Sequence, residues 1–280
     1  MKDFELYQPE TLEKAFSLLK GKDEYQLLAG GTDLLVKWKR GHMRPKNVIN
    51  LKKVKELDFI KVTDNEMEIG ALVKINDLIE MEEVQERYPA LSASCKQHSS
   101  SLIRNLATVV GNICNASPAA DLIPPLLVYD AKLKVKNEET ERLVELKDFF
   151  TGHPGGTKLS QGEIVTSVII PTPVEGQRSY FLKEGKRKAH EIAIMNCAVS
   201  YIDEGEQVSN LKVALGAVAP EPVFLDIDWF DSIGETSFER LSQEIEDNTS
   251  PITDQRSTEW YRRNVIQTLV KRAIVSADSV

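Results

Sequence analysis

The spacing of hydrophobic residues predicts short helices and strands that alternate along the chain. Leu12, Ala15, Phe16 and Leu19 recur at the three- and four-residue spacing of a helix with one buried face, which we expect to end at Gly21. Similar signals predict further helices at residues 34–39, 75–81, 89–97, 236–246 and 260–274, and a short helix that opens at Pro124. Short apolar runs between turn residues predict strands at residues 3–7, 25–29, 48–51, 57–62, 67–71, 131–135, 143–146, 164–170, 179–183, 192–201 and 211–218.

Helices and strands are mixed over the whole chain, which predicts an α+β fold. The 280 residues suffice for one large domain or for two to three small ones. We expect an α/β unit at residues 1–55, an α+β unit at 56–172 and a C-terminal α+β module at 173–280. The C-terminal module is expected to contain three strands and two helices, interrupted by the proline-rich residues 219–222.

Residues 27–34 place a glycine-rich turn, Gly30-Gly31-Thr32-Asp33, directly after an apolar strand. Successive backbone N–H groups at such a turn form a concave nest that suits phosphate oxygens. The carboxylate of Asp33 would repel an anion, so we expect Asp33 to cap the following helix.

Residues 104–121 are rich in small side chains, among which asparagines and Asp121 are interspersed. Small side chains let a backbone approach a ligand closely, and the hydroxyl and amide groups can then bond to that ligand. One glycine turn alone is more often an ordinary tight turn. Because the chain contains both runs, we expect them to bind one phosphorylated cofactor together.

The composition is that of an ordinary globular protein, with 41% hydrophobic and 28% charged residues. A net charge of −8 argues against nucleic acid or an anionic membrane surface as the main partner. The apolar runs are too short to cross a bilayer and the N-terminus has no apolar signal core, so we expect a cytoplasmic protein.

The cysteines and histidines do not suggest a metal site. Cys95, Cys114 and Cys197 are few and widely spaced, which argues against a disulfide framework, zinc or an iron–sulfur cluster in this chain. We expect all three to be buried, and the four histidines to be surface or packed residues.

The two small-residue runs resemble the flavin-binding motifs of the FAD subunits of molybdenum hydroxylases, the family of xanthine, carbon monoxide and nicotinate dehydrogenases. The similarity continues in order over most of the chain. It is carried by residues 28–34, 104–113, 116–121, 162–165, 170–171, 180–183, 215–220, 254–256 and 261–263. One departure is Val110, where the family usually has glycine; we expect Val110 to take an extended conformation, because β-branched residues disfavour a positive φ.

The resemblance implies a two-lobed FAD-binding region followed by the C-terminal module, with FAD lying between the lobes. It implies that residues 27–34 wrap the pyrophosphate and that a set in the second run holds the ribityl chain, the phosphates and the flavin. It also places Val165 on the flavin ring and Lys183 near the pyrimidine edge; from composition alone, Lys183 is one more solvated lysine of the basic segment 183–188. The implied cofactor-binding residues are Leu27, Leu28, Ala29, Gly30, Gly31, Thr32, Asp33, Leu34, Thr108, Gly111, Asn112, Ser117, Asp121, Val165 and Lys183.

The resemblance further implies a heterotrimeric oxidoreductase. Its large subunit would contain molybdopterin and its small subunit two [2Fe–2S] clusters, from which electrons would reach FAD and then NAD⁺ or another acceptor. Two alternatives remain open from the sequence. One is a stand-alone flavin oxidase or reductase of related fold, and the other is an assembly or binding protein that has lost FAD.

Overall fold

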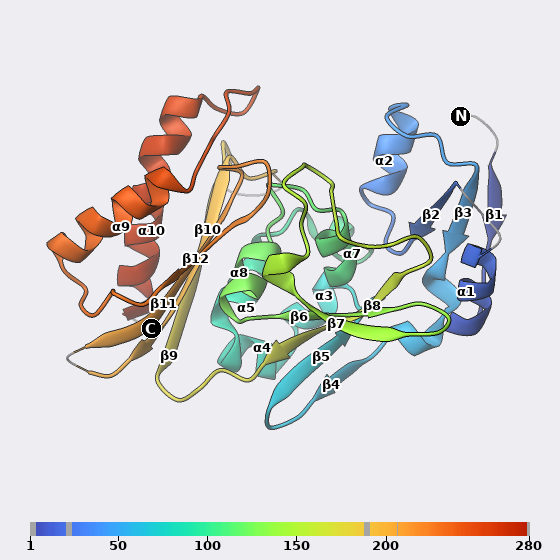
Figure 1. The fold of residues 1–280 in the computed structure, drawn as a ribbon, viewed down its shortest axis with the longest axis horizontal. Helices are drawn as coiled ribbons and strands as arrows, with labels where there is room; N and C mark the ends of the chain where they lie inside the picture. The colour runs from blue at the N-terminus through green and yellow to red at the C-terminus, as the bar shows by residue number, and fades with distance from the viewer. Residues whose placement is uncertain (1–3, 21–23, 188–190, 206, 279–280) are drawn as a thin grey trace.

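The computed structural model describes residues 4–20, 24–187, 191–205 and 207–278, and it contains three β-sheets. Figure 1 shows the N-terminal sheet at one end of the molecule and the C-terminal sheet at the other, with the largest sheet and most of the short helices between them. The end predicted for the first helix, Gly21, lies outside the described residues.

The N-terminal sheet consists of β1 (Glu5–Tyr7), β3 (Asn47–Asn50) and β2 (Tyr25–Leu28), which pair in parallel in that order. Helix α1 (Leu12–Lys20) connects β1 to β2, and α2 (Leu34–Lys39) follows β2. The apolar face of α1 is buried as predicted, and it packs into the same core as the central sheet.

The central sheet is antiparallel, in the order β4-β5-β8-β6-β7. Its strands are β4 (Ile60–Val62), β5 (Glu66–Gly70), β6 (Lys132–Lys136), β7 (Glu141–Glu145) and β8 (Ile164–Pro171). The helices of this unit are α3 (Ile75–Ile79), α4 (Glu82–Arg87), α5 (Pro89–Gln97), α6 (Ser101–Arg104), α7 (Val109–Cys114) and α8 (Ile123–Val128). Short 3₁₀ turns are η1 (Leu51–Lys53), η2 (Lys55–Leu57) and η3 (Leu146–Asp148).

The C-terminal sheet has four antiparallel strands, so the prediction of three was wrong. The strands are β9 (Gln177–Glu184), β10 (Met195–Asp203), β11 (Val208–Gly216) and β12 (Val223–Ile227). The missed strand, β12, begins directly after Pro222, where the missing N–H group is tolerated because β12 is an edge strand. Helices α9 (Glu235–Asp247) and α10 (Glu259–Asp278) follow it.

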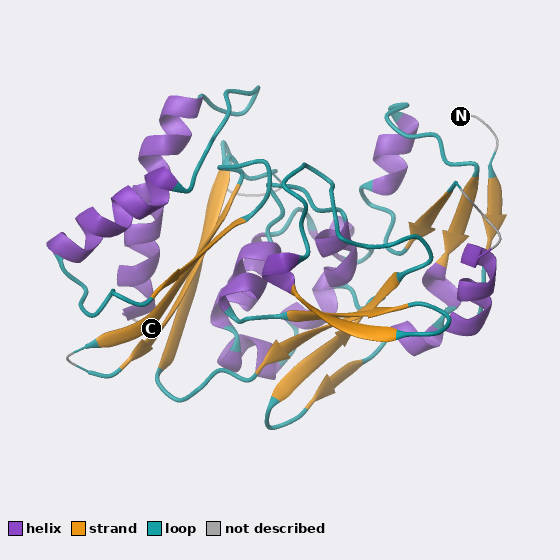
Figure 2. Ribbon diagram, in the orientation of Figure 1, coloured by secondary structure: helices purple, strands orange, loops and turns teal. Residues whose placement is uncertain are grey.

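The C-terminal sheet lies between two layers of helices, α9 and α10 on one face and α5 and α8 on the other (Figure 2). Because side chains alternate between the faces of a strand, Phe181, Ala198 and Ala214 join the core around α8, whereas Val199 and Val213 join the core beneath α10. The alanines allow α8, which follows residues 104–121, to pack closely on the C-terminal sheet, and the N–H of Ala217 donates to the carbonyl oxygen of Pro118 at 2.7 Å.

Among the described helices, none is both long and apolar enough to cross a bilayer.

Candidate functional site

The two small-residue runs meet in space. A Cβ atom placed on Gly30 would lie 2.2 Å from the carbonyl oxygen of Leu106 and 3.0 Å from Cα of Ala107. Only glycine permits this backbone contact, because any side chain at position 30 would push the two loops apart.

Lys37 connects the two runs a second time. Its ammonium lies 2.8 Å from Oδ2 of Asp33 and donates to Oδ1 of Asn115 at 2.6 Å. Asp33 precedes α2, but its side chain accepts no capping hydrogen bond, so the prediction of a cap was wrong. The paired ammonium instead compensates the charge that made Asp33 unsuitable beside an anion. Sequence reasoning missed Lys37, although its spacing of one helical turn from Asp33 was a usable signal.

The contact between the runs leaves hydrogen-bonding groups available. Within the described parts of the chain, the main-chain N–H groups of residues 30–34 donate no hydrogen bond. In the second run, the buried Oδ1 atom of Asn112 has no partner. Unpaired donors and a buried unpaired acceptor fit a ligand with phosphate oxygens and hydroxyl groups, because buried polar atoms are normally satisfied.

Helix α7 shapes the second run, although no helix was predicted there. The hydroxyl of Thr108 accepts the N–H of Gly111 at 3.0 Å and so caps α7 at its N-terminus. Val110 is helical and 3% exposed, and it packs in the core, so the expectation of an extended conformation was wrong. No positive φ is needed at this position, which explains how valine can replace glycine.

Asp121 lies at the centre of a buried polar cluster. Its Oδ2 atom accepts from Nζ of Lys183 at 2.8 Å and lies 3.0 Å from Nδ1 of His98, and its Oδ1 atom accepts from Nδ2 of Asn196 at 3.2 Å. An ionised carboxylate can only accept, so His98 carries its proton on Nδ1 when it bonds to Asp121. The sequence offered no signal for His98 or Asn196, because they come from a distant loop and strand.

Lys183 is not a solvated lysine. Its side chain is 8% exposed, and its partner Asp121 is 6% exposed. The structure therefore brings together two residues that the resemblance assigned to the cofactor, one from the second run and one from β9.

The remaining predicted residues differ in their burial and contacts. Oγ of Ser117 accepts the N–H of Ala119 at 3.3 Å and shapes the turn before Asp121. Leu28 is buried, and Leu27, Ala29, Thr32 and Leu34 are partly exposed along the first run. Val165 lies on β8 in the apolar core and is 3% exposed.

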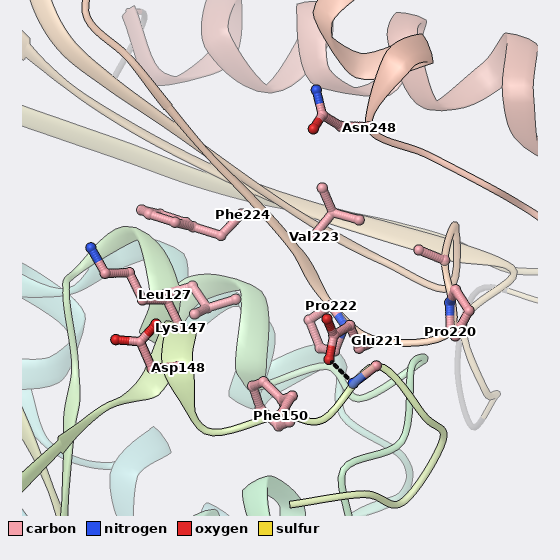
Figure 3. A pocket seen from close by; sticks show the side chains of 12 residues that line it. Leu127, Lys147, Asp148, Phe150, Pro220, Glu221, Pro222, Val223, Phe224 and Asn248 are labelled. Carbon is pink, nitrogen blue, oxygen red and sulfur yellow. Dashed lines mark hydrogen bonds between the residues drawn. The ribbon is translucent and has the colours of Figure 1, made fainter. Parts of the chain in front are cut away.

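A separate cavity of about 450 Å³ lies between η3 and the edge strand β12 (Figure 3). Glu221 points across it, and its Oε2 atom accepts the N–H of Gly152 at 2.5 Å. None of the predicted cofactor-binding residues lines this cavity. Its volume alone does not make it the cofactor site, because none of the residues of the two converging loops reaches it.

The three cysteines are free thiols. Cys95 and Cys197 are fully buried, as predicted, whereas Cys114 is partly exposed. Burial raises the pKa of each of the three thiols to about 12. Within the described residues, no three His, Cys, Asp or Glu side chains are grouped to hold a metal ion.

Two family models match this chain. The model described as the FAD binding domain in molybdopterin dehydrogenase matches residues 2–173, and the CO dehydrogenase flavoprotein C-terminal domain matches residues 180–226.

Known proteins resemble the chain over most of its length or nearly all of it. The xanthine dehydrogenase FAD-binding subunit of Escherichia coli O157:H7 is 31% identical over 99% of this chain and 97% of its own. The nicotinate dehydrogenase FAD-subunit of Eubacterium barkeri is 35% identical over 73% of this chain and 71% of its own. A chain of the carbon monoxide dehydrogenase of Hydrogenophaga pseudoflava superposes with a TM-score of 0.92 at 25% identity, covering 99% of this chain and 98% of that one.

These matches confirm the predicted family resemblance, the fold class and FAD as the cofactor. The loops fit that cofactor, because they offer unpaired donors and a buried unpaired acceptor where a dinucleotide has phosphates and hydroxyls. The chain belongs to the family of FAD-binding subunits of molybdopterin dehydrogenases.

Proposed function

We propose that the chain is the electron-transfer subunit of a cytoplasmic, multi-subunit molybdenum hydroxylase. It would receive electrons from [2Fe–2S] clusters on a small subunit, after a large molybdopterin subunit has oxidised the substrate, and pass them to NAD⁺ or another acceptor. The observation that supports this most is the contact between Gly30 and Leu106, which joins two loops with unpaired polar groups.

The proposal assigns the phosphates to the first loop. Residues 27–34 would bind the pyrophosphate through main-chain N–H groups, with Lys37 compensating the charge of Asp33. The lobes at residues 1–55 and 56–172 would bind the cofactor between them. The module at 173–280 would close one side of this cofactor site. The proposed contacts of FAD with the second run, β8 and β9 are Thr108, Gly111, Asn112, Ser117, Asp121, Val165 and Lys183.

Lys183 has an electrostatic role in this proposal. When bound, FAD supplies a centre that accepts electrons and passes them on. The buried ammonium of Lys183, held in place by Asp121, would stabilise negative charge that develops beside it. The low exposure of both side chains strengthens this effect, because water screens the charge less.

The relatives support a complex of several chains. Their names describe subunits or medium chains, and the three widely separated cysteines of this chain favour clusters on a partner. The departure of Val110 from the family's usual glycine does not argue for a protein without FAD, because Val110 is helical and buried.

The experiment is to tag the full chain, purify its native complex gently, and measure the flavin spectrum, iron and molybdenum per chain. We expect one FAD, two [2Fe–2S] clusters and one molybdenum for each copy of this chain. The flavin absorbance should bleach when the clusters are reduced. A colourless monomer that stays colourless after FAD is added would refute the proposal. A yellow monomer without iron or molybdenum would support the stand-alone flavoenzyme instead.

A further inference from the structure

His98 shares a single carboxylate oxygen with Lys183. Its Nδ1 atom lies 3.0 Å from Oδ2 of Asp121, the atom that also accepts from Nζ of Lys183. The side chain of His98 is 15% exposed, so water screens its interactions only weakly. Histidine is the side-chain type whose charge ordinarily changes near neutral pH, so this buried cluster contains a group that can gain or lose a positive charge.

The main chain holds His98 in this position. His98 caps the C-terminal end of α5, and its carbonyl oxygen accepts from Nη1 of Arg104 at 2.9 Å. The next residue, Ser99, has a φ of +46°, in the left-handed region that a non-glycine residue adopts only where its surroundings impose it. The Arg104 contact and this turn therefore fix the ring of His98 against Asp121.

The two ring nitrogens of His98 differ in what they can do. Nδ1 carries a proton, because the carboxylate of Asp121 can only accept. Nε2 has no hydrogen-bond partner among the described residues and is not fully enclosed, so solvent can supply a proton to it. A second proton therefore binds at Nε2, and the bond from Nδ1 to Asp121 stays intact when it does.

The surrounding charges decide when that proton binds. The charges of Asp121 and Lys183 cancel while the imidazole is neutral, and the cluster gains one positive charge when His98 becomes an imidazolium. Arg104 and the exposed Lys96 add two cations near the ring. Of the other elements packed against α5, α8 has no ionisable side chain. Those of α3, α4 and the rest of β9 form no hydrogen bond or ion pair with His98 among the described residues. A new negative charge beside Lys183 would therefore favour the imidazolium.

We infer that His98 takes up a proton from solvent at Nε2 when the flavin beside Lys183 is reduced. Two electrons and one proton convert bound FAD into its reduced anion. A second proton converts His98 into an imidazolium, so the total charge of flavin and cluster does not change. His98 acts through Asp121 and Lys183 and is a positioning residue, because nothing requires it to touch the reacting atoms. This inference rests on the proposed function, and it adds a proton-linked residue to the flavin site.

The test is the flavin midpoint potential as a function of pH in the native complex, purified through a tag on the full chain. The slope of the potential against pH gives the number of protons taken up with the electrons. His98→Asn keeps an N–H donor near the position of Nδ1 but has no group that binds a proton near neutral pH. His98→Gln is a second variant without a titrating ring. His42→Asn is the matched control, because His42 is exposed and forms no ion pair with other described residues.

In the wild type and in His42→Asn we expect an interval between about pH 5 and pH 8 with a steeper slope. Within it, roughly half a proton or more should be taken up per electron pair beyond the uptake of His98→Asn and His98→Gln. Equal slopes in the wild type and the His98 variants, with FAD bound, would overturn the inference, as a histidine that only supports Asp121 would give. A wild type without the steeper interval, or its loss in His42→Asn as well, would also overturn it. A wild-type complex without FAD would instead refute the proposed function.

Discussion

The ammonium of Lys183 lies 2.8 Å from Oδ2 of Asp121, although 62 residues separate the two in sequence. This ion pair connects β9 of the C-terminal sheet to the end of the second small-residue run. Both partners are largely buried, so each depends on the other for charge compensation. The C-terminal unit therefore contributes directly to the candidate site.

Replacing Lys183 with methionine should weaken the fold and change the flavin. Removal of one partner of a buried pair leaves an uncompensated charge, which typically costs about 3–5 kcal/mol of unfolding free energy. We also expect a lower flavin midpoint potential, because the cation that stabilises negative charge is gone. Chemical denaturation and a redox titration measure the two effects.

The double variant Asp121→Asn with Lys183→Met is the control for stability. It should recover part of the lost unfolding free energy, since neither side chain then carries a charge. A potential unchanged in Lys183→Met would exclude the electrostatic role of the ammonium.

Substitution of Gly30 by alanine should separate the two loops. The added Cβ would lie 2.2 Å from a main-chain oxygen, and neither backbone can move without displacing its loop. We expect at least a tenfold weaker affinity for FAD, measured by titration of the deflavinated chain. Gly234→Ala is the control, because its Cβ would meet no atom within 4 Å; equal affinity in both variants would argue against the loop contact.

Sequence reasoning found the elements with strong apolar periodicity and missed those that depend on local caps or neighbours. The apolar spacing of residues 12–19 predicted α1, and the glycine pair predicted the turn after β2. Helices α6 and α7 were missed because each begins at a capping hydroxyl, of Ser100 and of Thr108, within segments that show no apolar periodicity. β12 was missed because the proline-rich segment before it was interpreted as the end of the sheet.

Part of the candidate site could be predicted, because a single segment of sequence indicates its chemistry. This part comprises the two small-residue runs, including Asp121. His98 and Asn196 join the site only through tertiary contacts that no local pattern encodes, whereas the spacing of Lys37 one helical turn from Asp33 was a local signal that was overlooked.

Stability of the C-terminal unit should depend on pH through Asp254. Although burial opposes its ionisation, hydrogen bonds from Arg262 and Arg256 hold the pKa of Asp254 well below its ordinary value. A lowered pKa in the folded state gives stability that is present above the ordinary pKa, roughly 3.9, and is lost as pH falls towards the folded value. The difference in unfolding free energy between wild type and Asp254→Asn should therefore be large at pH 7 and shrink below about pH 4. A difference that is constant from pH 7 to pH 3 would contradict this account.

The cysteines should be unreactive in the folded chain. Burial raises the pKa of Cys95 and Cys197 to about 12, and the thiolate is the reactive form. Ellman's reagent at pH 8 should therefore label neither thiol before denaturant is added and both afterwards. Rapid labelling of Cys95 or Cys197 in the native chain would show that the core around it opens.

A crystal structure of the purified complex with FAD tests the central claim most directly. We predict that one FAD contacts both loops, with its pyrophosphate on the N–H groups of residues 30–34 and with a hydrogen bond to Oδ1 of Asn112. FAD bound elsewhere, for example in the cavity between η3 and β12, with both loops empty, would contradict the account.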